Sequence, residues 1–268
     1  MSTHETRLSD HEFAQFRKFI YGVAGISLSP VKKTLVAGRL TKRLRHHGLN
    51  SFTDYYRLIS AESEERQIAV DLLTTNETHF FREPKHFELL RDGLLAQHPR
   101  ERPFRVWSAA CSSGEEVYTL AMVLEESLGA GSWEVLGSDI SSKVLEQAES
   151  GLYSMERAPE LSQARLKRYC LKGIGSQEGR FIISPQLRSR VSFAQINLTA
   201  PLPSTGTFDA IFLRNVMIYF QPDTKRKVVE SLMNRLRPGG WFFIGHSESL
   251  TGLVKGLEGI APAVYRKV

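Results

Sequence analysis

Residues 104–116 carry the feature that most limits what this chain can fold into: an apolar run, a short stretch of small residues, and two acids. The order Phe-Arg-Val-Trp-Ser-Ala-Ala-Cys-Ser-Ser-Gly-Glu-Glu predicts a strand, a tight turn and the start of a helix. Dinucleotide-binding folds need three spaced glycines and a P-loop needs Gly-Lys-Ser/Thr, whereas this turn has only Gly114. The segment therefore predicts a nucleotide-type site without a phosphate cradle.

Two acids, Glu115 and Glu116, stand at the start of the predicted helix, where they repel phosphate and favour a cationic or neutral ligand. S-adenosylmethionine is the adenosine cofactor that carries positive charge and no phosphate. Residues 133–140 predict a second apolar strand that contains Asp139 near its end, where Rossmann-like units place the acid that binds ribose hydroxyls. Together the two segments predict a methyltransferase core. The alternative is an ordinary βαβ unit with a solvated acid.

Strand and helix signals alternate from residue 104 onward, which predicts an α/β fold with a parallel sheet. The expected strands cover residues 104–109, 133–140, 192–198, 208–214, 241–245 and 262–267, and the expected helices cover residues 114–128, 141–150 and 223–236. Residues 159–191 interrupt the repeat with Gly173, Gly175, Gly179 and an alternating Arg-Phe-Ile-Ile-Ser stretch. This segment predicts a small, basic antiparallel insertion rather than a helix.

Residues 1–73 show helical patterns without a strand signal and predict a separate all-α domain. Its four helices are expected to start at Ser9 or Asp10, near Val31, near Ser51 and near Ser63. Residues 74–103 are expected to form a linker, with a helix over residues 84–97, that contributes to the cofactor site. The methyltransferase domain is then expected to cover residues 104–268.

The net charge of +6 comes from the first fifty residues, which hold nine Lys and Arg against three Asp and Glu. No acid lies between Glu12 and Asp54. In the helix predicted over residues 31–47, Val36, Leu40 and Leu44 recur every fourth residue, and the basic residues lie on a different face. This asymmetry predicts an acidic partner surface.

Composition excludes several classes of protein. No apolar run approaches the roughly 20 residues that span a bilayer, and the polar N-terminus has no signal-peptide pattern, so we expect a cytoplasmic protein. Cys111 and Cys170 are too few for a disulfide scaffold, and no Cys-x-x-Cys or His-Glu-x-x-His spacing predicts a metal site. We interpret Cys111 as a packing residue.

Five sequence blocks occur in order along the chain. They are residues 74–83 (Thr-Thr-Asn-Glu-Thr-His-Phe-Phe-Arg-Glu), 106–116 (Val-Trp-Ser-Ala-Ala-Cys-Ser-Ser-Gly-Glu-Glu), 138–140 (Ser-Asp-Ile), 214–220 (Arg-Asn-Val-Met-Ile-Tyr-Phe) and 245–249 (Gly-His-Ser-Glu-Ser). On these blocks the chain resembles, nearly from end to end, the CheR-type chemotaxis receptor protein-glutamate O-methyltransferases.

The resemblance implies a Rossmann-like class I methyltransferase domain with an inserted antiparallel β-subdomain at about residues 159–191, preceded by an all-α domain that docks on the receptor. The implied S-adenosylmethionine contacts are Asn76, Thr78, Arg82, Glu115, Asp139, Asn197, Leu198, Arg214 and Asn215. Independently, Leu198 and Arg214 end predicted parallel strands, where open α/β sheets bind ligands. The choice of Glu115 over Glu116 rests on the resemblance alone. No metal is expected.

The implied reaction methylates glutamate side chains of bacterial chemotaxis receptors, which serves sensory adaptation, and yields methyl esters and S-adenosylhomocysteine. A glutamate with a pKa of about 4.3 is already ionised at neutral pH, so the enzyme must position it rather than deprotonate it. We expect Arg82 to hold the carboxylate and Tyr219 to orient one of its oxygens. The alternatives are a structural ion pair for Arg82 and a core role for Tyr219. We interpret His79 and His246 as structural histidines.

Four basic residues, Arg39, Lys42, Arg43 and Arg45, are expected to dock on the acidic methylation helices of the receptor bundle, and the alternative is a solvated charged face. The insertion is expected to hold a receptor C-terminal tail by adding a strand to its edge. A nucleic-acid methyltransferase that uses the basic patches, and a receptor-binding module that only senses S-adenosylmethionine, remain alternatives. We expect a monomer with no nucleic-acid partner and no membrane insertion.

Overall fold

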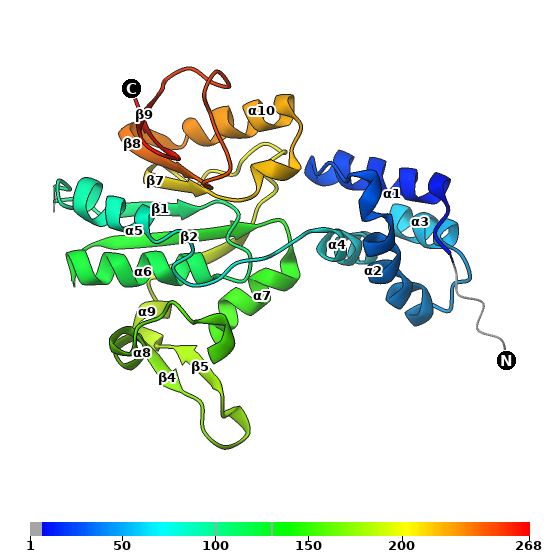
Figure 1. The fold of residues 1–268 in the computed structure, drawn as a ribbon, viewed down its shortest axis with the longest axis horizontal. Helices are drawn as coiled ribbons and strands as arrows, with labels where there is room; N and C mark the ends of the chain where they lie inside the picture. Colours follow the sequence, from blue (N-terminus) through cyan, green and yellow to red (C-terminus); the bar gives the residue numbers. More distant parts are fainter. Residues whose placement is uncertain (1–6, 100, 130) are drawn as a thin grey trace. The chain divides into compact units, whose positions relative to one another are not determined.

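The computed structural model describes residues 7–99, 101–129 and 131–268, which form two compact units (Figure 1). The first unit comprises the described residues up to Thr75 together with Tyr219–Thr224. The second comprises Asn76–Ile218 and Lys225–Val268. Residues 1–6, where the all-α domain was expected to begin, lie outside the described part. Among the described residues, no helix is both long and apolar enough to cross a membrane.

The first unit is helical, as predicted. Its helices are α1 (Asp10–Ala24), the 3-10 turn η1 (Pro30–Lys32), α2 (Lys33–His46), α3 (Phe52–Ala61) and α4 (Ser63–Leu73). Ser9 and Glu12 form a capping box at the start of α1, and Gly25 ends this helix with a φ of 69°. The Phe16 ring packs edge-on against Phe52 in the core. In the described part of this unit, extended pairing is confined to one bridge, Ile26 to Phe220.

A buried carboxylate on α4, Glu65, ties together three elements of this unit. It is 3% exposed and accepts hydrogen bonds from Arg43 on α2 and from the Tyr55 hydroxyl on α3 (2.7 Å), and His47 Nε2 lies 3.0 Å away. Burial alone acts to raise the pKa of Glu65, but the hydrogen bonds from Arg43, Tyr55 and His47 outweigh it and lower the pKa to about 2.

Two of the four basic residues expected on the docking face are therefore engaged inside the unit. Arg43 pairs with Glu65, and Arg39 donates to the carbonyls of Leu72 (3.0 Å) and Thr74 (2.8 Å). Lys42 and Arg45 are exposed. The basic surface that a partner can reach on α2 is narrower than the sequence suggested.

The second unit is built on a seven-stranded sheet in the order β6-β2-β1-β7-β8-β10-β9 (Figure 1). The strands are β1 (Phe104–Ser108), β2 (Trp133–Asp139), β6 (Val191–Gln195), β7 (Phe208–Leu213), β8 (Leu236–Ile244), β9 (Leu257–Ala261) and β10 (Val264–Lys267). The first five in sheet order are parallel, and β10 pairs antiparallel with both β8 and β9. All six residues of β7 are buried, and Phe212 stacks on Phe243 of β8 with ring centroids 4.2 Å apart.

The helices that the sequence predicts for this unit are present near their expected positions. They are α5 (Lys85–Leu89) with the π-helical segment η2 (Leu90–Leu95), α6 (Glu115–Leu128), α7 (Ser142–Ser150) and α10 (Pro222–Met233), whose first turn belongs to the first unit. The 3-10 turn η5 (Met217–Tyr219) follows β7.

The strand prediction for this unit was wrong in three places. β8 begins at Leu236 rather than 241. Leu236 and Trp241 both pair with β7, and residues 237–240 bulge out between them, which hides the strand start in the sequence. β9 was missed, since it is a short edge strand that buries little and has a weak apolar pattern. β6 ends at Gln195, so Asn197 and Leu198 follow the strand instead of ending it.

The inserted subdomain begins earlier than predicted and is not wholly extended. Its antiparallel sheet has the order β3-β5-β4, with β3 (Leu152–Ser154), β4 (Cys170–Lys172) and β5 (Arg180–Ile183). It also contains α8 (Gln163–Tyr169), α9 (Pro185–Arg188) and the turns η3 (Met155–Arg157) and η4 (Gly175–Gln177). The prediction of no helix was wrong for α8, whose start is marked by Ser162 accepting from the Arg165 amide.

The Glu65 cluster gives the first prediction. Arg43→Ala leaves a buried carboxylate without its guanidinium partner, and we expect the free energy of unfolding to fall by about 3 kcal/mol. Lys42→Ala, the neighbouring exposed residue, should change it by less than about 0.5 kcal/mol. Urea unfolding of the full chain at pH 7 measures both.

The stabilisation that the Arg43–Glu65 pair provides depends on pH. Because the pKa of folded Glu65 is lowered to about 2 from about 4.3 unfolded, the stabilisation is present above pH 4.3 and is lost as the pH falls toward 2. The wild-type advantage over Arg43→Ala should shrink over that window. An advantage that is unchanged at pH 2.5 contradicts this account of the pair.

Candidate active site

The topology of the large sheet defines where a ligand binds. β1 lies between β2 and β7, so the chain departs to one side of β1 after α6 and later continues on its other side. In open α/β sheets, ligands occupy the crevice outside the carboxyl ends of the strands at such a switch point. The predicted site residues of this unit follow the carboxyl ends of four adjacent strands or lie on the segment before α5.

The turn after β1 is tightly built. Ser112 and Gly114 both have positive φ (49° and 91°), and a side chain at Gly114 would place its Cβ 2.7 Å from the Ala148 Cβ. Gly114 is thus required by both backbone and packing. Cys111 in this turn is 1% exposed, and burial raises the pKa of its thiol well above the ordinary value, in agreement with a packing role.

Asp139, at the end of β2, organises two backbone segments. Its carboxylate accepts from the Ser112 amide (2.9 Å) and from the Ser141 amide (3.0 Å). Its own carbonyl accepts from the Ile196 amide (3.0 Å), which brings Asn197 and Leu198 next to it. Asp139 as a whole is 8% exposed and lies at the edge of the sheet where the ribose-binding acid was predicted.

The two acids that open α6 have different surroundings. Glu115 is fully buried, and its Oε2 accepts a hydrogen bond from the Ser113 hydroxyl (2.7 Å). Its Oε1 lies 2.8 Å from Arg157 Nη2, an ion pair without hydrogen-bonding geometry. Burial raises the pKa of Glu115 although Ser113 and Arg157 oppose the shift. The oxygens of Glu116 instead accept from the Ser108 hydroxyl (2.7 Å) and from Arg214 (2.8 Å). Both carboxylates are thus engaged within the protein, Glu116 with Ser108 and Arg214, and Glu115 with Ser113 and Arg157.

The segment that precedes α5 lies against this turn. Ser112 Oγ donates to the Asn76 carbonyl (3.0 Å) and Arg157 to the Thr78 carbonyl (3.2 Å). The Arg82 guanidinium donates to the Glu77 carbonyl (2.9 Å). Asn76 and Thr78 are thereby brought to the edge that carries Asp139 and Glu115, while Arg82 bonds within its own segment.

Arg214 and Asn215 follow β7 and close the site on the side of β8. Arg214 pairs with Glu83 (3.0 Å), and Asn215, at φ 57°, donates its amide to Glu248 (3.0 Å). Burial acts to raise the pKa of Glu83, but Arg214 outweighs it and the pKa lies below its ordinary value. Glu248 also accepts from the amides of Gly245 and Ile218.

Three residues near Arg214 offer metal-ligand atoms within 4.8 Å of one another: Glu83, His86 and His246. His86 is 1% exposed, and burial lowers its pKa to about 4, so its ring is neutral at physiological pH. The Arg214 guanidinium occupies the Glu83 carboxylate and repels a cation there. The His246 backbone amide donates to Glu83 (3.3 Å), whereas its ring Nε2 lies 4.0 Å from that carboxylate and the ring packs on His86.

Sequence reasoning missed Glu83, Arg157 and Glu248 as members of this cluster. Glu83 and Glu248 do lie in the quoted blocks at residues 74–83 and 245–249, so a signal was present for both. Arg157 lies in the 3-10 turn that follows β3, and nothing in its local sequence marks it.

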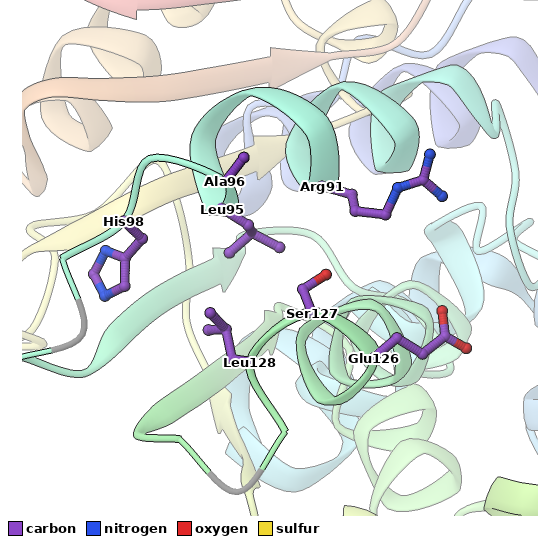
Figure 2. Close-up of a pocket in the computed structure, with 7 residues that line it drawn as sticks. All are labelled: Arg91, Leu95, Ala96, His98, Glu126, Ser127 and Leu128. Carbon is purple, nitrogen blue, oxygen red and sulfur yellow. The ribbon is translucent and has the colours of Figure 1, made fainter.

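A cavity of about 270 Å³ lies elsewhere in this unit (Figure 2). Its lining includes Leu95 and His98 from the segment after α5, and Glu126 and Leu128 from the last turn of α6. Because α6 begins at the carboxyl end of β1 and ends just before β2 starts, this cavity lies at the opposite edge of the sheet. None of the predicted site residues is among those that line it.

Tyr219, the second expected catalytic residue, is half-buried and belongs to the segment that groups with the helical unit. Its carbonyl accepts from the Ser27 amide (2.8 Å), and the next residue, Phe220, bridges Ile26. Its backbone is thus fixed within the first unit.

The donor set fits S-adenosylmethionine. The turn after β1 combines a cramped glycine with two carboxylates and has no phosphate-binding pattern, while Asp139 places a further carboxylate at the end of β2. Sulfonium and ammonium groups require such charge, and ribose hydroxyls require such acceptors.

Comparison with known proteins agrees with this chemistry. Residues 76–263 match the family described as CheR methyltransferase, SAM binding domain, and residues 11–74 match CheR methyltransferase, all-alpha domain. Chemotaxis protein methyltransferase 2 of Pseudomonas aeruginosa is 42% identical over 98% of this chain and 94% of its own length. The chemotaxis protein methyltransferase of Escherichia coli is 43% identical over 98% and 93%. These names give no support to a nucleic-acid methyltransferase.

Among solved structures, the N-methyltransferase NodS from Bradyrhizobium japonicum, in complex with S-adenosyl-l-homocysteine, aligns with a TM-score of 0.44 at 16% identity. The alignment covers 76% of this chain and 96% of NodS. A likeness at this level does not bear on function.

The geometry around Asp139 gives a test of the site. The Asp139 carboxylate accepts from two backbone amides, and Asp139→Asn replaces one of its oxygens by an NH2 group that can only donate. We expect S-adenosylhomocysteine to bind about tenfold more weakly, a loss of about 1.4 kcal/mol. Glu134→Gln, at the other end of the same strand, should bind as the wild type does. Isothermal titration calorimetry measures both, and wild-type affinity in Asp139→Asn removes Asp139 from the site.

Proposed function

Because the chain belongs to the CheR methyltransferase family, we propose that it transfers the methyl group of S-adenosylmethionine to glutamate side chains of chemotaxis receptors. The observation that carries the proposal is the set of carboxylates, without a phosphate cradle, at the carboxyl ends of β2 and β1. The products are a glutamate methyl ester and S-adenosylhomocysteine.

The proposed cofactor-binding residues are those expected from the sequence. They are Asn76, Thr78, Arg82, Glu115, Asp139, Asn197, Leu198, Arg214 and Asn215. Their support is that they gather along one edge of the second unit, linked by the contacts described above. The choice of Glu115 over Glu116 rests on the family resemblance, because both carboxylates are engaged within the protein.

The cofactor, when bound, supplies a methyl group on a cationic sulfur, an electrophile that needs no general base. A carboxylate oxygen of the receptor glutamate forms the new C–O bond while the C–S bond breaks, and no proton is transferred. The protein's task is therefore alignment. Arg82 binds the incoming carboxylate and keeps it ionised, and Tyr219 donates a hydrogen bond to one of its oxygens.

Receptor recognition is assigned to two surfaces. The exposed Lys42 and Arg45 of α2 contact the acidic methylation helices, while Arg39 and Arg43 hold the shape of the helical unit. The edge strand β4 of the inserted subdomain holds a receptor tail by strand addition, beside the exposed Leu171 and Ile174. The enzyme acts as a monomer.

The reaction product gives the first test. Receptor-containing membranes incubated with methyl-labelled S-adenosylmethionine should take up label that mild alkali releases as methanol, because the product is an ester. Membranes without receptors are the control. Base-stable label, or label in nucleic acid, contradicts the assigned substrate.

The two catalytic residues are separated by their kinetic effects. We expect Arg82→Lys to lower both turnover and cofactor affinity, each about tenfold, and Tyr219→Phe to lower turnover about tenfold with unchanged cofactor affinity. Steady-state methylation combined with S-adenosylhomocysteine titration measures both quantities. Unchanged turnover in either variant removes the role assigned to that residue.

Docking is tested at residues that the fold does not need. The double charge reversal Lys42→Glu and Arg45→Glu should raise the KM for receptor by about tenfold at low salt, and the difference should diminish in high salt. Lys143→Glu, an exposed charge on α7, is the matched control. An unaltered KM in the double variant at low salt overturns the docking surface.

A further inference from the structure

The backbone around Arg82 is held in an unfavourable conformation. Phe81 and Glu83, on either side of it, have φ angles of 54° and 56°, in the left-handed region that residues other than glycine seldom adopt. Two such residues in three do not persist by local preference, so surrounding groups must impose the turn. We call residues 81–83 the Arg82 turn.

One side of the Arg82 turn is fixed by α6. The Phe81 amide donates to the hydroxyl of Thr119 (3.1 Å), and that hydroxyl donates in turn to the Glu115 carbonyl (2.7 Å). Thr119 is fully buried, and Phe81 is 6% exposed. The hydroxyl therefore satisfies a buried amide that a regular helix or strand would have paired.

The other side is fixed by Arg214. Its Nη2 donates to the Arg82 carbonyl and to the Glu83 carboxylate (3.0 Å), and its Nη1 donates to Glu116 (2.8 Å). Glu116 is itself held by the Ser108 hydroxyl of β1 (2.7 Å). The turn is thus connected to the ends of β1 and β7 through one guanidinium.

From the sequence, Arg214 could either bind the cofactor directly or orient neighbouring protein groups. Its surroundings in the structure favour the second role. Its side chain is 3% exposed, and both terminal nitrogens are occupied by protein acceptors. A guanidinium engaged in this way orients the groups it binds. Thr119, which is buried, bonds to the turn, and Glu116, which is partly buried, bonds to Arg214.

We infer that Thr119, Arg214 and Glu116 are positioning residues that fix the Arg82 turn, and so act on the cofactor and on the reacting carboxylate through Arg82. This inference rests on the proposed function for the role of Arg82. It refines that proposal, because Arg214 contributes to cofactor binding by way of the turn.

A double-mutant cycle tests this dependence. Thr119→Val removes the acceptor of the Phe81 amide and keeps the shape of the side chain. In the wild-type background it should weaken S-adenosylhomocysteine binding and lower turnover by about tenfold each, whereas in the Arg82→Ala background it should change either by less than about twofold. Ser127→Ala, which removes a hydroxyl bonded to the Val123 carbonyl on the same helix, should have no effect in either background.

The outcomes of the cycle are distinct. Effects of Thr119→Val and Arg82→Ala that multiply overturn the inference, because Thr119 then acts independently of Arg82. An Arg82→Ala variant with wild-type affinity and turnover also overturns it, since nothing remains for the positioning residues to act through. A third outcome is that Thr119→Val weakens S-adenosylhomocysteine binding only when Arg82 is present, while the wild-type enzyme fails to methylate receptors. That outcome contradicts the proposed substrate and leaves the positioning role intact.

A second variant covers a failure of Thr119→Val to fold. Glu116→Gln removes the charge and keeps one of the two acceptor oxygens that Ser108 and Arg214 use, and the same cycle with Arg82→Ala should show the same loss of effect. Thermal unfolding of each variant establishes that affinity is measured on folded protein. Independent effects of Glu116→Gln and Arg82→Ala on affinity overturn the inference as well.

Discussion

The buried guanidinium of Arg214 joins segments that lie far apart in the sequence. It bonds to Glu83 and the Arg82 carbonyl before α5 and to Glu116 at the start of α6, while it stands at the end of β7. Removal of one partner from a buried ion cluster leaves an uncompensated charge, which is strongly destabilising. The cluster therefore fixes the carboxyl edge of the sheet as one rigid assembly, and the segment that carries Arg82 depends on it.

The sequence was sufficient where a structure depends on neighbours along the chain. The strand, turn and helix at residues 104–116 were predicted because Gly114 and the apolar run act locally, and Asp139 because it ends a clear apolar strand. The bulge in β8, the edge strand β9 and the helix α8 depend on pairing or on weak patterns, and they were missed. Arg43 looked like a surface charge because its partner, Glu65, lies on another helix.

The two units differ in the charge of the residues that matter most in each. In the helical unit, part of the positive charge stabilises the fold through Glu65 and backbone carbonyls, and the exposed remainder suits an acidic partner. In the second unit, the carboxylates of Asp139 and Glu115 lie at the carboxyl ends of β2 and β1, where we propose that the cationic cofactor binds. Part of the excess of basic residues in the first fifty positions therefore stabilises the fold, and only the exposed part is proposed to bind a partner.

The central claim is that the carboxyl edge of β6, β2, β1 and β7 binds the cofactor. Hydrogen–deuterium exchange of the full chain with and without S-adenosylhomocysteine tests it most directly. The account predicts slower exchange, on ligand binding, of the backbone amides in residues 76–83, 109–115 and 139–141. Protection confined to the cavity lined by Leu95, His98 and Leu128 at the opposite edge of the sheet would contradict it.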